Sequence, residues 1–218
     1  MSNSQPVLVF NSGAGRTGKT SVVNAIKAMA PVFGRKVVSM PSITRSVYAE
    51  LGIPDEGTAL DMSVDMQLRL QAAINAKYYS SAEEFLKASQ DADMVMIDRS
   101  PYDHISYFLH GMMMHTTVDE VKGKIEHANE WMAMMGGFCS KQYIVNFPFP
   151  EPWHTETQSS DGFRRDPSGK NLVWAMLLDK LLLDASWFLR GRGITFMTFP
   201  EQGMTVDARA RYLLETCK

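Results

Sequence analysis

Eight consecutive residues, Gly13-Ala14-Gly15-Arg16-Thr17-Gly18-Lys19-Thr20, match the pattern G-x-x-x-x-G-K-[ST]. Loops with this pattern bind the phosphates of nucleoside triphosphates, because their glycines let several backbone N–H groups approach one phosphate. The lysine of such a loop reaches the β- and γ-phosphate oxygens, and the final hydroxyl holds Mg²⁺. The motif therefore predicts a site for ATP and Mg²⁺, with Thr20 on the metal. The predicted donor-binding residues are Gly13, Ala14, Gly15, Arg16, Thr17, Gly18, Lys19, Thr20 and Ser21.

The residues on either side of this glycine-rich loop predict the strand and the helix that phosphate binding requires. Val7 to Phe10 is an uninterrupted apolar run, which is typical of a buried strand. Residues 21–30 follow the loop and carry apolar side chains at helical spacing. A glycine-rich turn without a ligand is the alternative interpretation, and the strand–loop–helix order argues against it.

Four further apolar runs predict strands, and most of the segments between them have the periodicity of helices. The predicted strands cover residues 7–10, 36–40, 94–97, 141–147 and 193–199. A short helix that Pro41-Ser42 caps is expected to end at Leu51. Other helices are predicted at 60–89, 100–114, 118–135, 172–189 and 206–217.

The long helical segment at 60–89 contains a candidate break near Ser80-Ser81. Ser81 is followed three residues later by Glu84, which is the spacing of a capping box at the start of a helix. We therefore expect a second helix to begin at this point.

Alternating strands and helices predict an α/β fold of three layers, in which a five-stranded parallel sheet has helices on both faces. The whole chain, 1–218, is expected to form a single domain. Ligands of such sheets bind at the carboxyl ends of the strands. The loop Gly13–Thr20 and Asp98 both follow predicted strands, so we expect them to be neighbours in space.

Asp98 and Arg99 follow the third predicted strand. A carboxylate in this position can organise hydrated Mg²⁺, or it can accept a proton from an attacking hydroxyl. Arg99 is a candidate for holding a phosphate or the acceptor. The alternative is that Asp98 only caps the next helix; the glycine-rich loop nearby favours a catalytic role.

A polar, proline-containing segment at 148–169 is a candidate lid. It carries Arg164 and Arg165 within the sequence Asp161-Gly-Phe-Arg-Arg-Asp166. Phosphoryl transfer requires positive charge over the phosphates while water is excluded. Two arginines on a closing loop would supply this charge; a solvated surface turn is the alternative.

Three segments in this order, Gly13–Thr20, Asp98–His104 and Asp161–Arg164, resemble those of the P-loop nucleoside and nucleotide kinases. Their order and spacing are most similar to the branch that includes nicotinamide-riboside-kinase-like domains and many bacteriophage-encoded kinases. Residues 41–45 (PSITR) and 50–53 (ELGI) are similar to the segment after the second strand in that branch. The resemblance covers most of the chain and implies the P-loop NTPase fold.

The resemblance implies catalytic roles at the matching positions. Lys19 would bind the donor triphosphate together with the glycine-rich loop. Asp98 would be the base or the carboxylate that organises the metal, and Arg99 would position phosphate. Arg164, with Arg165 as its neighbour, would be the lid arginine.

The candidate acceptor residues lie mainly in the helices at 43–90. Arg45 is assigned to the acceptor side by the resemblance. Gln67 and Gln71 share one helix face, and a glutamine amide can read the edge of a base; a solvated face is the alternative. Asp103 could face the same cleft, and a capping or surface role is equally open.

The function that the resemblance implies is transfer of the γ-phosphoryl group of ATP to a nucleoside- or nucleotide-like acceptor. Some bacteriophage relatives phosphorylate a hydroxymethylated base in DNA, so a DNA-modifying kinase remains an alternative. A P-loop ATPase or switch that acts through a protein partner is another. A homodimer is compatible with all three.

Composition restricts the class of protein. The 218 residues are 45% hydrophobic and 21% charged, which suits a globular domain with a substantial core. A net charge of −2 argues mildly against an obligate nucleic-acid binder. The two distant cysteines favour a reducing compartment, and no apolar run is as long as a membrane span. We therefore expect a cytoplasmic protein without a membrane partner.

Overall fold

The computed structural model describes residues 5–13, 17–54, 58–59, 62–112, 117–148, 193–201 and 203–218. The predicted helix at 172–189 and all of the candidate lid except Pro148 lie outside these residues. The described elements are β1 (Val7–Ser12), α1 (Lys19–Met29), η1 (Ala30–Phe33), β2 (Val37–Ser39), α2 (Ile43–Glu50), α4 (Val64–Ala88), β3 (Met94–Asp98), α5 (Pro101–Met112), α6 (Val118–Met135), η2 (Gly136–Phe138), β4 (Lys141–Asn146), β5 (Ile194–Thr198) and α8 (Val206–Thr216).

The strands form one parallel sheet in the order β2-β3-β1-β4-β5, which confirms the predicted fold class. Strand β1 is central, so the loop that follows it emerges between the carboxyl ends of β3 and β4. The register pairs Asn11 of β1 with Asp98 of β3 and Ser12 with Asn146 of β4. The expectation that Asp98 lies near the glycine-rich loop is thereby confirmed.

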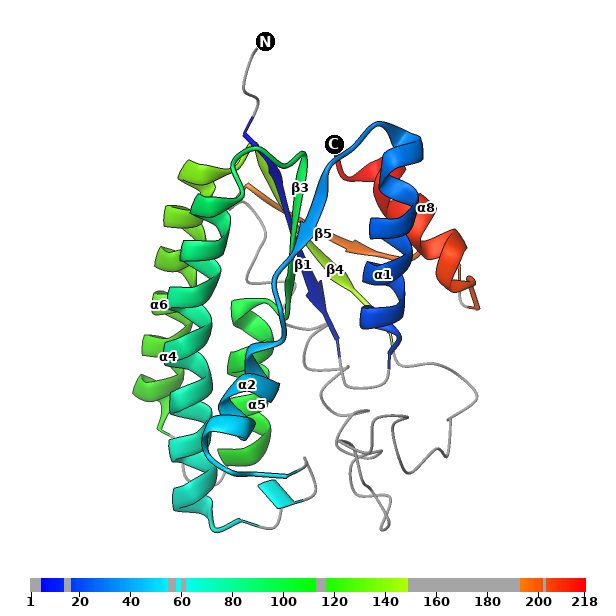
Figure 1. Cartoon of the computed structure of the whole chain (residues 1–218). Coiled ribbons are helices and arrows are strands. Elements are labelled where there is room, and N and C mark those ends of the chain that lie inside the picture. Colours follow the sequence, from blue (N-terminus) through cyan, green and yellow to red (C-terminus); the bar gives the residue numbers. More distant parts are fainter. Residues whose placement is uncertain are drawn as a thin grey trace.

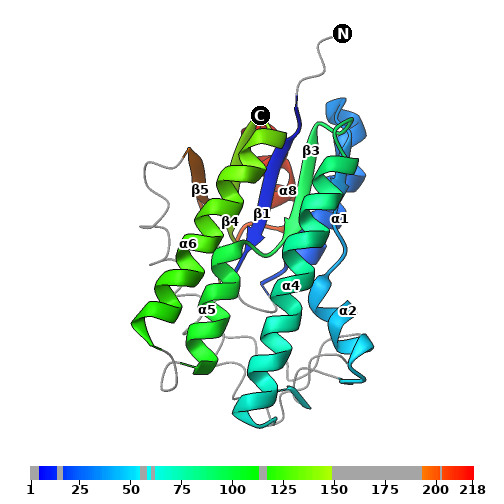
Figure 2. The same ribbon diagram turned by 90° about the vertical axis from the view of Figure 1, so that its left-hand side faces the viewer.

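Helices cover both faces of the sheet, as predicted (Figure 1). Helices α1 and α8 lie on one face, and α4, α5 and α6 lie on the other (Figures 1 and 2). Alternate side chains of each strand therefore enter two separate cores. Leu8, Phe10, Val95, Ile97 and Ile144 pack under α4–α6, whereas Val7, Val9, Met94, Met96 and Val145 pack under α1 and α8.

The predicted break near Ser80-Ser81 is wrong, because α4 runs without interruption from Val64 to Ala88. The hydroxyl of Ser80 donates to the carbonyl groups of Ala76 and Lys77, so it folds back on the helix and does not cap a new one. A stripe of buried side chains at four-residue spacing also holds the helix against the core across this point. The stripe consists of Leu70, Ile74, Tyr78, Ala82 and Leu86.

Local sequence explains where other helices begin. At the start of α6, Thr117 Oγ1 accepts the N–H of Glu120 (3.3 Å), and the Glu120 carboxylate accepts the N–H of Thr117 (2.8 Å). This reciprocal pair is a capping box. The Thr205 hydroxyl accepts the N–H of Ala208 in the same way at the start of α8.

Both cysteines, Cys139 and Cys217, are buried free thiols. Burial raises the pKa of Cys139 to about 11 and that of Cys217 to about 12, so neither is a reactive thiolate near neutral pH. No helix in the described ranges is long and apolar enough to cross a membrane.

Candidate donor site and adjoining pocket

The glycine-rich loop begins at Gly13, where the backbone has a positive φ of 125°. A Cβ at this position would lie 2.5 Å from the carbonyl oxygen of Phe147, so only glycine fits. Gly18 also has a positive φ, 83°, and caps the start of α1. Ala14, Gly15 and Arg16 lie outside the described residues.

Lys19 turns its ammonium group into the loop. Its Nζ donates to the carbonyl of Gly13 (2.9 Å) and to Oγ1 of Thr17 (3.2 Å), and the residue is 7% exposed. Thr20 and Ser21 are exposed at the first turn of α1. This places the predicted donor lysine inside the loop and the predicted metal hydroxyl at its rim.

Arg99 has a φ of 77°, which makes it the one residue besides glycine with a positive φ in the described part of the chain. Such a backbone costs about 1–3 kcal/mol and persists only where the surroundings impose it. Here the N–H of Arg99 donates to the carbonyl of Asn11 (3.0 Å), and the Tyr78 hydroxyl donates to the carbonyl of Arg99 (2.6 Å). The guanidinium of Arg99 is thereby directed to the carbonyl of Gly13, to which it donates.

The carboxylate of Asp103 lies beneath the loop and not in the adjoining pocket. Its Oδ1 accepts the backbone N–H of Gly13 (3.0 Å), and its Oδ2 accepts the N–H (2.6 Å) and the hydroxyl (2.5 Å) of Ser100. The Arg99 guanidinium is 3.7 Å from Oδ1. The sequence left two kinds of role open for Asp103, facing the acceptor cleft or capping a helix. Its carboxylate oxygens bind the donor loop and the first turn of α5, where Ser100 Oγ accepts the N–H of Asp103 in return (3.2 Å), which is a capping contact.

Asp98 and Thr20 carry oxygen atoms, which are the ligands that Mg²⁺ prefers. Asp98 is half-buried at the carboxyl end of β3, where it pairs with Asn11 of β1, two residues before Gly13. Proteins bind Mg²⁺ through one or two carboxylates, with water and substrate phosphates completing the octahedron. Among the described residues no cluster of three or more His, Cys, Asp or Glu forms a self-sufficient metal cage.

The strand ends next to the glycine-rich loop carry buried polar side chains. Oδ1 of Asn11 and both amide atoms of Asn146 are buried without a hydrogen-bond partner in the part of the chain that the structure describes. Buried polar atoms of this kind usually contact ordered water or a ligand. Both residues lie at the carboxyl ends of neighbouring strands, where ligands of parallel sheets bind.

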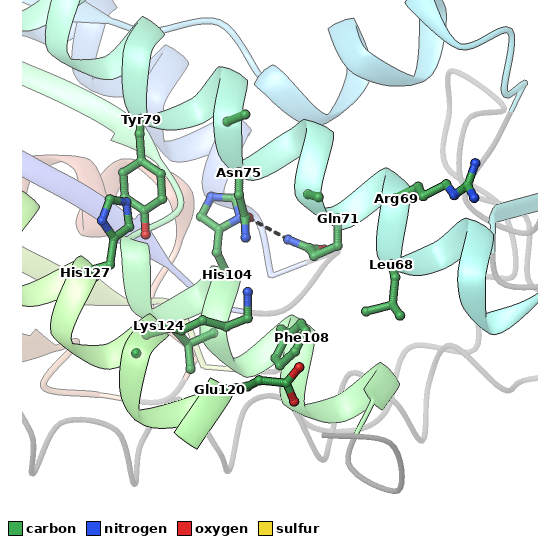
Figure 3. Close-up of a pocket in the computed structure, with 14 residues that line it drawn as sticks. Leu68, Arg69, Gln71, Asn75, Tyr79, His104, Phe108, Glu120, Lys124 and His127 are labelled. Carbon is green, nitrogen blue, oxygen red and sulfur yellow. Dashed lines mark hydrogen bonds between the residues drawn. The ribbon is translucent and has the colours of Figure 1, made fainter. Parts of the chain in front are cut away.

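A pocket of about 730 Å³ opens between α4, α5 and α6 (Figure 3). Its surface is mainly apolar and aromatic, with a few polar groups. Lys124 Nζ lies 4.1 Å from the centroid of the Phe108 ring, and the rings of Tyr79 and His127 meet edge to face at 4.7 Å. The lining residues are Leu68, Arg69, Gln71, Ala72, Asn75, Ala76, Tyr79, His104, Ile105, Phe108, Glu120, Gly123, Lys124 and His127.

His104 lines the pocket and directly follows Asp103, the residue that binds the glycine-rich loop, in the first turns of α5. Its ring lies 4.3 Å from the ring of Tyr78. Burial lowers the pKa of His104 to about 4, so the imidazole is neutral near pH 7. Its Nε2 has no hydrogen-bond partner among the described residues.

The predicted acceptor residues are only partly brought together. Gln71 lines the pocket, where its amide donates to Oδ1 of Asn75 (2.8 Å; Figure 3). Gln67 is one turn away, and its amide donates to the carbonyl of Met62 (2.9 Å). Arg45 is exposed on α2 and is not a lining residue of this pocket.

Sequence reasoning missed most of the pocket. Phe108 stands one helical turn after His104 on α5, and Lys124 and His127 stand one turn apart on α6. Helical spacing was the available signal, but it does not reveal which helix faces are adjacent. Arg164 and Arg165 lie outside the described residues, so their predicted contribution stays a prediction.

Comparison with known proteins identifies the fold. No protein-family model matches the sequence, and no curated protein matches it either. Among solved structures, thymidylate kinase from Candida albicans is similar over 97% of this chain and 90% of its own, with 12% identity and a TM-score of 0.56. The NadR protein, solved in complex with NR, is similar over 96% of this chain and 49% of its own, with 10% identity and a TM-score of 0.57. This chain therefore spans about half the length of NadR. The chain has the same α/β fold as these two proteins.

Proposed function

We propose that the protein is an ATP- and Mg²⁺-dependent kinase that transfers the γ-phosphoryl group to a nucleoside- or nucleotide-like acceptor. One observation carries the proposal: the cations of Lys19 and Arg99 converge on the carbonyl of Gly13 at the start of the glycine-rich loop. Asp98 pairs with Asn11 at the neighbouring strand end. His104 of the aromatic pocket follows Asp103, which binds the Gly13 N–H. The fold shared with thymidylate kinase and NadR supports the same proposal.

The donor side uses the groups of the loop. The ammonium of Lys19 and the guanidinium of Arg99 leave the Gly13 carbonyl for the phosphate oxygens, where they stabilise the charge that develops during transfer. Thr20 and Asp98 would hold Mg²⁺, which when bound neutralises charge on the β- and γ-phosphates. Arg164 and Arg165 would add charge from the candidate lid.

The acceptor side uses the pocket between α4, α5 and α6. Its volume, about 730 Å³, lies within the range of about 300–1,000 Å³ usual for small-molecule sites. Tyr79 and Phe108 provide aromatic surface for a base. The Gln71 amide lines the same pocket and is suited to hydrogen bonds with the edge of that base.

The role of Asp98 depends on the acceptor group. A hydroxyl acceptor must lose a proton as it attacks, and the Asp98 carboxylate is the group at the strand end that can accept it. A phosphate acceptor already carries a negative oxygen and needs no base. Replacement of Asp98 by Asn therefore reports on the acceptor. Both kinds of acceptor would lose a carboxylate ligand of Mg²⁺, but only a hydroxyl acceptor would also lose its base, so its transfer rate should fall further.

The test is a transfer assay with γ-labelled ATP and Mg²⁺. Acceptors are deoxynucleosides, nucleoside monophosphates, nicotinamide riboside, and DNA oligonucleotides with and without hydroxymethylated pyrimidines. We expect label on a nucleoside or nucleotide, and a loss of about 10²–10³-fold in Lys19→Ala, because one charge that stabilises the transition state is removed. Lys27→Ala, on the exposed face of the same helix α1, is the matched control.

Other outcomes would assign the alternatives. Label on hydroxymethylated DNA alone would indicate the DNA-modifying kinase. Label only as free phosphate, whatever acceptor is added, would favour the ATPase or switch. Full transfer activity in Lys19→Ala would contradict the proposed use of the loop.

A further inference from the structure

We propose that Asp103 is a positioning residue for the donor triphosphate, which fastens the first residue of the glycine-rich loop to helix α5. The inference rests on the proposed ATP site but concerns a residue that need not touch ATP. Asp103 is 90 residues from Gly13 in sequence, and its side chain is fully buried. A buried carboxylate is costly unless every oxygen is satisfied, and here both are.

The geometry requires a carboxylate and not merely a polar side chain. Oδ1 accepts the backbone N–H of Gly13, and Oδ2 accepts the backbone N–H of Ser100. An asparagine would have to point its NH₂ group at one of these two N–H donors, because it has only one acceptor oxygen. Replacement of Asp103 by Asn therefore breaks the connection at one end, although the side chain keeps its size.

Gly13 connects Asp103 to the two cations, because its N–H and its carbonyl bind different partners. The N–H of Gly13 is held by Asp103, while its carbonyl receives Lys19 Nζ and the Arg99 guanidinium. On its other side Gly13 packs tightly against the carbonyl of Phe147. Asp103 thus determines where the Gly13 carbonyl lies, and with it where both cations wait for the phosphates.

The experiment measures the Kd of ATP·Mg²⁺ by calorimetry for the full chain, well below the temperature of unfolding. We expect Asp103→Asn to weaken ATP binding by about 10-fold or more, since a charged hydrogen bond contributes about 1.5–3 kcal/mol. Asp119→Asn is the matched control, because Asp119 is also an acid in the first turn of a helix but is exposed. It should bind ATP within about 2-fold of the unchanged protein.

A double-mutant cycle separates positioning from general destabilisation. If Asp103 acts by placing Lys19, then Asp103→Asn should weaken ATP binding much less in a Lys19→Ala background than alone. A purely structural role would lower the midpoint of thermal unfolding and leave the Kd of the folded protein unchanged.

Each outcome has a defined meaning. An ATP Kd for Asp103→Asn within 2-fold of the unchanged protein would overturn the inference. If that variant does not fold, Ser100→Ala is the milder change: it removes the hydroxyl that donates to Oδ2 and that accepts the N–H of Asp103, and it leaves the Asp103 carboxylate in place. It should weaken ATP binding by about 3-fold, and an unchanged Kd would overturn the inference equally. If the unchanged protein itself does not bind ATP, or Lys19→Ala binds it equally well, the proposed function fails instead.

Discussion

The two faces of the sheet are built from different kinds of side chain. Under α1 and α8 the strands contribute aliphatic residues, methionine and Tyr143, and the helices close over them with aliphatic residues such as Val22, Ile26 and Leu213. Under α4–α6 the helices contribute the aromatic residues Tyr78, Tyr102 and Trp131 to the core. The Tyr78 hydroxyl donates to the Arg99 carbonyl just after β3, and the Tyr102 hydroxyl donates to Oδ1 of Asn129. The first face mainly provides stability, and the second also positions the candidate site.

Aromatic residues make this difference because they combine apolar area with a hydrogen-bonding tip. Tyr78 is fully buried in α4, yet its hydroxyl holds the strained backbone of Arg99. Burial raises the pKa of Tyr78 well above its usual value, so the hydroxyl remains a donor. One side chain thus belongs to both the core and the site.

The largest expected stability effect lies on the α1–α8 face. Leu213→Ala should lower the free energy of unfolding by about 2–5 kcal/mol, because it leaves a cavity in a closed apolar core. The Kd of ATP for the folded protein should not change. Urea unfolding and calorimetry measure the two quantities, with the exposed Val206→Ala as the control. A large change in ATP binding would contradict the division between the two faces.

The second prediction concerns pH and the α4–α6 face. The pKa of His104 is about 4 in the folded protein because the ring is buried, against about 6.5 in the unfolded chain. The unfolded chain therefore binds a proton first, and stability falls as the pH drops from above 6.5 toward 4. We expect His104 to account for a loss on the order of 2 kcal/mol between about pH 7.5 and pH 5.

His104→Gln tests this prediction, because it removes the titrating group. Unfolding by urea at both pH values should show less pH dependence in this variant than in the unchanged protein. Equal pH dependence in the two proteins would show that His104 is not the group that titrates.

The smallest expected effect comes from removing one tyrosine hydroxyl on each face of the sheet. Because the chemical change is the same, the two variants compare the two faces directly. Tyr78→Phe leaves the Arg99 carbonyl without its hydroxyl donor, and Tyr143→Phe removes a hydroxyl that donates to the Lys218 carbonyl (3.2 Å). Each should cost about 1 kcal/mol of stability. Only Tyr78→Phe should also reduce kcat, since Arg99 loses part of its support. Equal transfer rates in the two variants would contradict the assignment of Tyr78 to the site.

The sequence predicted the sheet well, because buried parallel strands are short apolar runs bounded by turns. Met94 to Ile97 was read as a strand and is one, and the helix at 118–135 has the predicted bounds. The break in α4 was predicted wrongly from Ser81 and Glu84. A capping pattern is a local signal, and packing of the whole helix against the core outweighs it.

The candidate site shows the same limit. The glycine-rich loop is recognisable because its chemistry is contained in eight consecutive residues. The pocket cannot be recognised in this way, because it is formed where faces of α4, α5 and α6 meet. Helical spacing shows which residues share a face, but it does not show which helix that face packs against.

The amino-acid sequence by itself determined the glycine-rich motif, the alternation of strands and helices, and the strand-end position of Asp98. These features depend on residues that are close together in the chain. Only the tertiary structure decided that Asp103 holds Gly13, that Tyr78 holds Arg99, and that three helices enclose a pocket. These contacts join residues that are distant in sequence, and their geometry follows from how the helices pack on the sheet.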